Sequence, residues 1–208
     1  MKRSFLWRTL QAVARIFTSL MFDLKVYGIE NVPQTGPALL LANHQSYLDP
    51  ILVAVRLRRP VSFFAKSELF ENPYFGWLIR SLHAFPVRLG AGDIGAVREL
   101  IQRLEEGHVM NVYPEGTRSD DGQIGEIQRG IALVLRKAHV PVIPVVIDGS
   151  FEAWPRDSKL FHAHPIRVLY GKPMHLEGLK GDEIVKTVGN TLRTLLAELR
   201  SMQRLPTV

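Results

Sequence analysis

Two polar blocks each follow an apolar run of strand length, and this pattern limits the fold more than any other feature of the chain. Residues 38–42 lead into Asn-His-Gln-Ser-Tyr-Leu-Asp at 43–49, and residues 108–112 lead into Tyr-Pro-Glu-Gly-Thr-Arg-Ser at 113–119. A continuous apolar run bounded by polar residues is typical of a buried strand. Both blocks are therefore expected where buried strands end.

Apolar runs alternate with amphipathic stretches along the rest of the chain. The expected strands are at 24–29, 38–42, 61–65, 84–88, 108–112, 142–147 and 166–170. The expected helices are at 5–22, 49–57, 76–82, 93–106, 131–138 and 182–204. Strands that alternate with helices indicate an α/β fold. We expect a single-domain sandwich with a central mixed or mostly parallel sheet, flanked by helices.

Composition sets the outer bounds of the interpretation. A chain of 208 residues with 46% hydrophobic positions can bury one full core. The absence of cysteine excludes disulfides and thiolate metal sites. A formal net charge of +6, with a pI near 9.8, favours an anionic partner, either nucleic acid or an acidic membrane surface. The basic residues do not alternate with aromatic residues as in an RNA-binding motif, which favours the membrane.

The stretch 5–22 is predicted to be an amphipathic helix. Its apolar positions at helical spacing are Phe5, Leu6, Leu10, Val13, Phe17, Leu20 and Met21. Arg8 and Arg15 interrupt the run, so neither a signal peptide nor a membrane span is expected. A helix lying in the bilayer interface, supported by Lys2 and Arg3, fits better. The alternative is a helix packed on its own domain.

The first polar block contains a candidate catalytic pair. A sharp bend after the strand could bring Asp49 onto one ring nitrogen of His44, which would then act as a base. The second block places Glu115, Thr117 and Arg118 around a glycine, which suits a phosphate or a hydroxyl-bearing substrate. The structural alternative for the first block is a turn histidine beside a helix-capping aspartate.

The two blocks together resemble the glycerolipid acyltransferases of the lysophosphatidic acid acyltransferase family. Their marks are N-H-x-x-x-x-D and, later, F/Y-P-E-G-T-R-S, and the resemblance extends over about 24–173. It includes Ala-Lys-Ser-Glu-Leu at 65–69, Pro-Val-Arg at 86–88 and Val-Pro-Val-Ile-Pro-Val at 140–145. It implies transfer of a fatty acyl chain from acyl-CoA or acyl carrier protein to the free hydroxyl of lysophosphatidate, which gives phosphatidate. No cofactor and no metal are expected.

The resemblance also implies roles for individual residues. His44 would be the general base and Asp49 its partner, with no covalent acyl-enzyme. The residues expected to bind the acceptor and its phosphate are Lys66, Arg88, Glu115, Gly116, Thr117 and Arg118. The implied organisation is an interface helix at 1–23 and an acyltransferase domain at 24–208. The expected location is peripheral, on the cytoplasmic face of the cell membrane.

Two departures from the family pattern leave the acceptor open. Ile-Gln-Arg-Gly stands at 127–130, where the family commonly has Phe-Lys before a glycine. Val87 stands where an acidic residue often precedes the arginine. Arg129 could replace the missing lysine charge. A lyso-ornithine lipid or another lysophospholipid therefore remains an alternative acceptor.

Two further motifs offer rival interpretations. Residues 90–95 fit G-x-G-x-x-G between a strand and a helix, as in a dinucleotide site, with Glu115 as the acidic residue. Pro114 and the lack of a second domain count against that site. His162 and His164 could chelate a metal, but no third ligand accompanies them, and a solvated loop is favoured.

Overall fold

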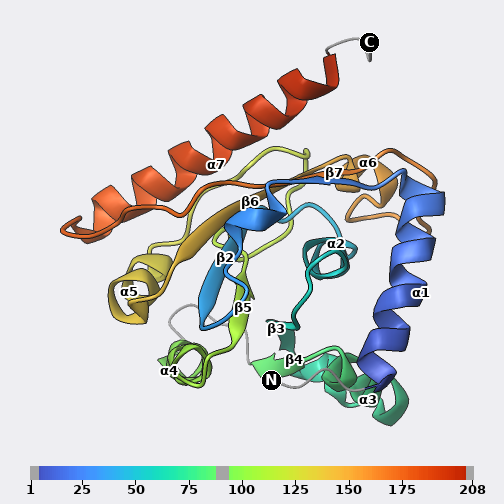
Figure 1. Ribbon diagram of the computed structural model, residues 1–208, viewed down its shortest axis with the longest axis horizontal. Coiled ribbons are helices and arrows are strands. Elements are labelled where there is room, and N and C mark those ends of the chain that lie inside the picture. The colour runs from blue at the N-terminus through green and yellow to red at the C-terminus, as the bar shows by residue number, and fades with distance from the viewer. Residues whose placement is uncertain (1–4, 88–93, 205–208) are drawn as a thin grey trace.

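A seven-stranded sheet runs through the centre of the computed structural model, which describes residues 5–87 and 94–204 (Figure 1). Its strands are β1 (Lys25–Tyr27), β2 (Ala38–Ala42), β3 (Val61–Lys66), β4 (Ala84–Val87), β5 (Val109–Val112), β6 (Val142–Asp148) and β7 (Arg167–Tyr170). The order across the sheet is β1-β7-β6-β2-β5-β3-β4. All neighbouring pairs are parallel except β6 and β7. The expectation of a mixed, mostly parallel sheet is confirmed.

Helices cover both faces of this sheet. They are α1 (Phe5–Phe22), α2 (Asp49–Ala54), α3 (Pro73–Ser81), α4 (Ile94–Glu105), α5 (Gly130–Ala138), α6 (Ser150–Ala153) and α7 (Gly181–Arg204). Two 3-10 turns, η1 (Ile29–Asn31) and η2 (Ser67–Phe70), complete the assignment. The sequence had not indicated the short helix α6.

The central strand β2 is fully buried, and its side chains divide the core in two. Leu39 and Leu41 pack with α4, α5 and α7, while Leu40 packs with α1 and α2 on the other face. Figure 1 shows these two groups of helices on opposite sides of the strands. Burial on both faces explains why this segment is continuously apolar.

Helix α1 has the predicted bounds and docks through a mixed side, on which Trp7, Thr18 and Phe22 are buried and Gln11 and Arg15 are half-buried. Gln11 donates to the carbonyl of Leu57 at 2.8 Å, and Arg15 donates to that of Val55 at 2.8 Å, both just beyond α2. On the outside, Ile16 is 63% exposed and Leu20 is 80% exposed. A helix that packs on a soluble domain normally buries its apolar stripe. The exposed apolar residues of α1 are called here its outer stripe: Phe5, Val13, Ile16 and Leu20. The described residues leave this stripe largely uncovered.

Candidate active site

The predicted pair forms at the carboxyl end of β2. Nδ1 of His44 lies 2.8 Å from Oδ2 of Asp49, the first residue of α2. The same oxygen accepts hydrogen bonds from the backbone amides of Gln45 and Ser46 at 2.6 and 2.7 Å. Because a carboxylate only accepts, the imidazole donates from Nδ1, so the neutral form of this ring has its lone pair on Nε2. Asp49 thus holds the preceding bend and the imidazole, and does not act as an N-cap.

Ser150 completes the support of Asp49 from a distant part of the chain. Its buried hydroxyl donates to Oδ1 of Asp49 at 2.7 Å. Gly149, with φ +89°, allows the chain to turn directly before it, since a Cβ there would lie 2.2 Å from the carbonyl oxygen of Pro165. Sequence reasoning missed this serine. The only available signal was Asp-Gly-Ser after the apolar run 142–147.

Glu115 connects the two polar blocks. Its Oε1 accepts from the backbone amide of His44 at 2.8 Å, and its Oε2 accepts from that of Gly125 at 2.7 Å. The amide of Ser119 also donates to the carbonyl of His44 at 2.7 Å. Burial raises the pKa of Glu115, and the two backbone hydrogen bonds partly oppose this rise. Both carboxylate oxygens therefore serve to position the backbone around His44.

Tyr113 forms one wall of the site. Its ring stacks on the imidazole of His44, with the ring centroids 3.9 Å apart and the planes 17° from parallel. Burial of its hydroxyl raises the pKa of Tyr113 well above its usual range, so the ring stays neutral. The stack restricts rotation of the imidazole in addition to the hydrogen bond that His44 donates to Asp49.

Arg118 of the second block stacks on a side chain of the first block. Its guanidinium lies over the ring of Tyr47 at 3.6 Å from the centroid. Its Nη1 is buried and has no hydrogen-bond partner among the residues that the structure describes. Buried donors are nearly always satisfied, so this nitrogen is suited to an anionic ligand.

The remaining predicted acceptor residues are less tightly defined. Lys66 is exposed and ends β3, at the same edge of the sheet as both blocks. Gly116 adopts φ +73°, and Thr117 is exposed beside it. Arg88 lies outside the described residues.

The departures at 127–130 have distinct structural roles. Ile127 is buried in the core, and the backbone amide of Gln128 donates to the carbonyl of Pro114 at 2.8 Å. Arg129 is exposed directly before α5. The chain therefore fills the usual aromatic position with an apolar residue and keeps a charge nearby.

The rival motifs gain no support from the described part of the chain. The glycines at 90 and 92 lie outside it, and Gly95 lies in the first turn of α4. Nδ1 of His164 is 3.0 Å from the carbonyl oxygen of Pro165. Within the described residues, no group of three histidine or carboxylate side chains is placed to hold a metal.

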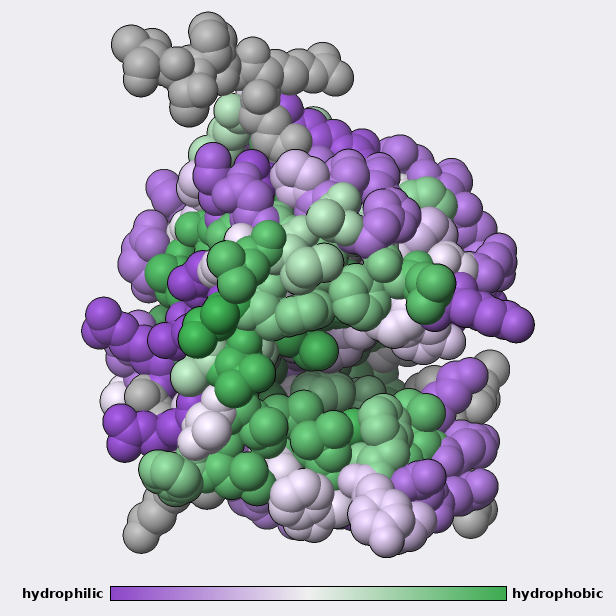
Figure 2. Space-filling model, turned by 90° about the vertical axis from the view of Figure 1, so that its right-hand side faces the viewer, coloured by the Kyte–Doolittle hydropathy of each residue, from purple (hydrophilic) through white to green (hydrophobic). Residues whose placement is uncertain are grey.

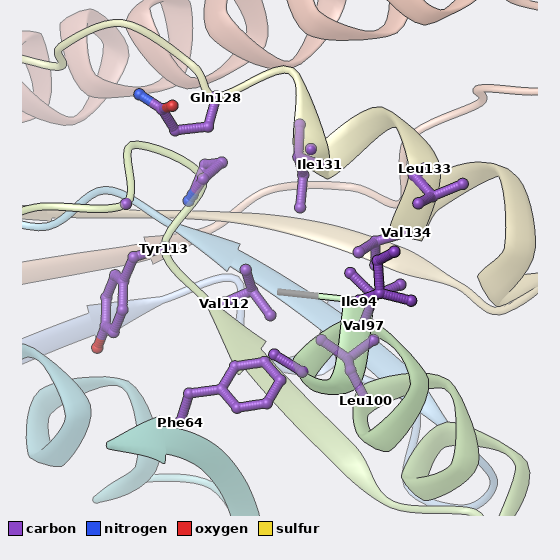
Figure 3. A pocket seen from close by; sticks show the side chains of 14 residues that line it. Phe64, Ile94, Val97, Leu100, Val112, Tyr113, Gln128, Ile131, Leu133 and Val134 are labelled. Atoms are coloured by element: carbon purple, nitrogen blue, oxygen red, sulfur yellow. The ribbon is translucent and has the colours of Figure 1, made fainter. Parts of the chain in front are cut away.

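An apolar cavity of about 260 Å³ adjoins the second block (Figure 3). It lies on the α4 and α5 side of the sheet and is lined by Phe64, Val97, Leu100, Val112, Ile131 and Val134. Tyr113, Gly116 and Gln128 border it, as Figure 3 shows for the labelled side chains. The cavity could accept a hydrocarbon chain next to the catalytic pair.

Comparisons with known proteins identify relatives of this chain. The chain is 29% identical over 195 residues to a chloroplastic 1-acyl-sn-glycerol-3-phosphate acyltransferase of Arabidopsis thaliana; the match covers 89% of this chain and 52% of that protein. It is 28% identical to the 1-acyl-sn-glycerol-3-phosphate acyltransferase of Bacillus subtilis, with 77% and 78% covered. The chain thus spans about half the length of the plant relative and more of the bacterial one.

A solved structure and a family model complete the comparison. The fold matches the crystal structure of the 1-acyl-sn-glycerophosphate acyltransferase PlsC of Thermotoga maritima with a TM-score of 0.78 and 30% identity. That match covers 92% of this chain and 79% of the other. The family model described as Acyltransferase matches residues 23–148, which is more than half of the chain. The chain therefore belongs to the acyltransferase family.

Proposed function

We propose that the protein transfers a fatty acyl chain from acyl-CoA or acyl carrier protein to the free hydroxyl of lysophosphatidate, giving phosphatidate. One observation carries the proposal: Asp49 holds the imidazole of His44 at 2.8 Å while three other donors hold Asp49. This arrangement fixes one tautomer and directs Nε2 toward a substrate.

The reaction needs no nucleophile from the protein. Nε2 of His44 takes the proton of the acceptor hydroxyl as that oxygen attacks the thioester carbonyl. The tetrahedral intermediate then expels the thiolate, which receives the proton from the imidazolium, so the products are an ester and a thiol. Asp49 stabilises the imidazolium without taking the proton. The serine nearest to His44 in the sequence, Ser46, is not assigned as a nucleophile. Its hydroxyl donates to the backbone carbonyl of Trp154 at 3.0 Å.

The acceptor phosphate is assigned to Arg118, with Lys66 as a second cation. Nη1 of Arg118 is buried and has no hydrogen-bond partner within residues 5–87 and 94–204, which supports this, since a guanidinium can donate to two phosphate oxygens. The exposed Lys66 would act as a point charge. The cavity beside Gly116 is assigned to the acyl chain of a substrate because its lining is mainly apolar.

The enzyme is proposed to work as a peripheral protein on the cytoplasmic face of the membrane. Among the described residues, no helix combines the length and the hydropathy that crossing a bilayer requires. The outward apolar stripe of α1 supports a helix that lies in the interface.

Incubation with labelled acyl donors tests the proposal. Purified protein is given acyl-CoA or acyl-acyl carrier protein with lysophosphatidate, a lyso-ornithine lipid or other lysophospholipids, and the product is identified by mass. His44→Ala should lower turnover by about two to four orders of magnitude while the protein stays folded. Transfer to none of these acceptors, or near-normal turnover by His44→Ala, would contradict the proposal.

A further inference from the structure

Helix α3 presents large aromatic side chains to solvent from a firmly held backbone. Tyr74 is 86% exposed and Trp77 is 59% exposed, and Phe75 is also exposed. The side chain of Asn72 caps the helix by accepting from the amides of residues 74 and 75 at 3.1 and 3.0 Å. Gly76 packs so closely that a Cβ would lie 2.9 Å from the carbonyl oxygen of Phe70. The helix is therefore fixed by contacts that do not use its aromatic side.

Helix α3 lies on the same side of the molecule as α1 (Figure 1). Figure 1 places α3 at the N-terminal end of α1, and Figure 2 looks onto that side. Apolar surface extends from the middle of the view into its lower part, beside a hollow. Phe5, Val13, Ile16 and Leu20 are the most exposed apolar residues of α1. A contiguous apolar surface of this kind marks a contact site.

A series of ring contacts connects this face to the active site. The ring centroid of Phe17 in α1 lies 5.7 Å from that of Phe161, and the ring centroid of Phe161 lies 5.7 Å from that of Trp154. Trp154 lies 5.4 Å from Tyr47, the residue on which the guanidinium of Arg118 stacks. A continuous series of aromatic contacts thus leads from α1 to the proposed phosphate-binding arginine.

We infer that α3 is a second bilayer contact, which works with α1 to fix the orientation of the enzyme on a phospholipid surface. Tryptophan and tyrosine suit the boundary between headgroups and acyl chains, because each has an apolar body and a polar tip. The described part of α1 has no acidic residue and exposes Arg8, which complements anionic lipid. A single helix in the interface could roll about its axis, whereas contacts on two helices prevent this rotation.

The charges around α3 predict that its contribution to bilayer binding depends on salt differently from that of α1. Lys66 and Arg80 are balanced by Glu68 and Glu71, and Arg80 stacks over the ring of Phe70 at 4.7 Å. The contact made by α3 is therefore apolar and should resist salt. The inference rests on the proposed function, since a bilayer-resident acceptor makes a fixed orientation useful. Binding to vesicles can nevertheless be measured without turnover.

Sedimentation with vesicles of phosphatidylethanolamine and phosphatidylglycerol tests the inference. The double variant Tyr74→Ser/Trp77→Ser should lower the partition coefficient of the full-length protein by about tenfold or more, equally at low and high salt. Met202→Ser, which changes an exposed apolar residue of α7, is the matched control and should bind as the wild type does. Thermal melts should be the same for all three proteins.

Fluorescence locates the contact on α3. Brominated lipids in the vesicles should quench the tryptophan fluorescence of the wild type. The fraction of fluorescence that is quenched should be smaller in Trp77→Phe. Activity of the double variant should fall on acceptor embedded in vesicles and persist on a short-chain soluble lysophosphatidate.

Three results would overturn the inference. They are wild-type vesicle binding by the double variant, equal quenching of the wild type and Trp77→Phe, and a wild-type dimer in sedimentation equilibrium that the double variant loses. The last result would identify this face as a contact between copies of the chain. Failure of acyl transfer with every acceptor would refute the proposed function alone, because the binding and quenching measurements would still decide the role of α3.

Discussion

Arg15 points from α1 into the protein and donates from Nε to the backbone carbonyl of Val55 at 2.8 Å. The last carbonyls of a helix have no partner within it, and the end of α2 is satisfied in part by this guanidinium. Gln11 acts in the same way on the carbonyl of Leu57. These polar groups of α1 therefore take part in docking beside the buried Trp7 and Phe22, while Val13, Ile16 and Leu20 face outward.

Arg15 and Arg8 should consequently respond differently to neutralisation. Arg15→Gln should reduce the free energy of unfolding by about 1–3 kcal/mol, because a charged donor to buried carbonyls is lost. Arg8→Gln should leave stability unchanged and weaken binding to anionic vesicles at low salt only. Urea unfolding and vesicle sedimentation of both variants check this. Equal effects of the two changes on both measurements would show that Arg15 has no special role in docking.

Periodicity could predict that α1 is amphipathic but not which of its sides faces the protein. Residues such as Val13 and Ile16 share the outer part of the helix because of the 3.6-residue repeat alone. The inward side carries donors to the carbonyls at the end of α2, which lie some 40 residues further along the chain. The sequence pattern of residues 5–22 alone does not show that these distant carbonyls require hydrogen-bond donors.

In the active site, too, contacts between residues close in sequence were predictable, and a contact between distant segments was not. His44 and Asp49 are five residues apart on one bend, so the sequence could predict their contact, and Arg118 follows the next strand along the same edge. Ser150 is 101 residues from Asp49, and its approach depends on β6 lying next to β2. The strands themselves were predictable because β2, β5 and β6 are almost continuously apolar.

Removal of the hydroxyl of Ser150 should impair chemistry more than binding. Ser150→Ala leaves Oδ1 of Asp49 without its closest donor, so kcat should fall about tenfold with KM unchanged for both substrates. Its effect should largely vanish in an Asp49→Asn background, because the two residues act through one contact. Ser62→Ala is the matched control, since Ser62 is also fully buried but has no hydrogen-bond partner among the described residues. Additive losses in the double mutant would contradict the proposed role.

The phosphate assignment gives a test on Arg118. Arg118→Ala should raise KM for lysophosphatidate roughly 10- to 100-fold and leave KM for the acyl donor nearly constant, as expected for loss of a charge-assisted hydrogen bond. Arg118→Lys should restore only part of the affinity, because an ammonium cannot supply a planar fork. Arg136→Ala, an exposed arginine on α5, is the control. A parallel rise in both KM values would indicate a general defect instead.

Glu115 should make the stability of the fold depend on pH in a particular direction. Burial raises the pKa of this carboxyl above its ordinary value of 4.5. From about pH 4.5 up to the raised value, the folded protein binds more protons at this position than the unfolded chain does. The free energy of unfolding therefore receives a contribution from Glu115 that decreases as pH rises through that window.

Glu115→Gln removes this titration and also replaces one acceptor oxygen with an amide nitrogen, which cannot accept from the backbone amide of His44 or Gly125. The variant should be less stable than the wild type, by about 1–3 kcal/mol at pH 4. This gap should narrow toward pH 7, because only the wild type has to charge a buried carboxyl. Urea unfolding at half-unit steps of pH measures the gap, and Glu198→Gln, at an exposed position of α7, serves as the control. A gap that stays constant or widens with pH would show that Glu115 does not carry this burial cost.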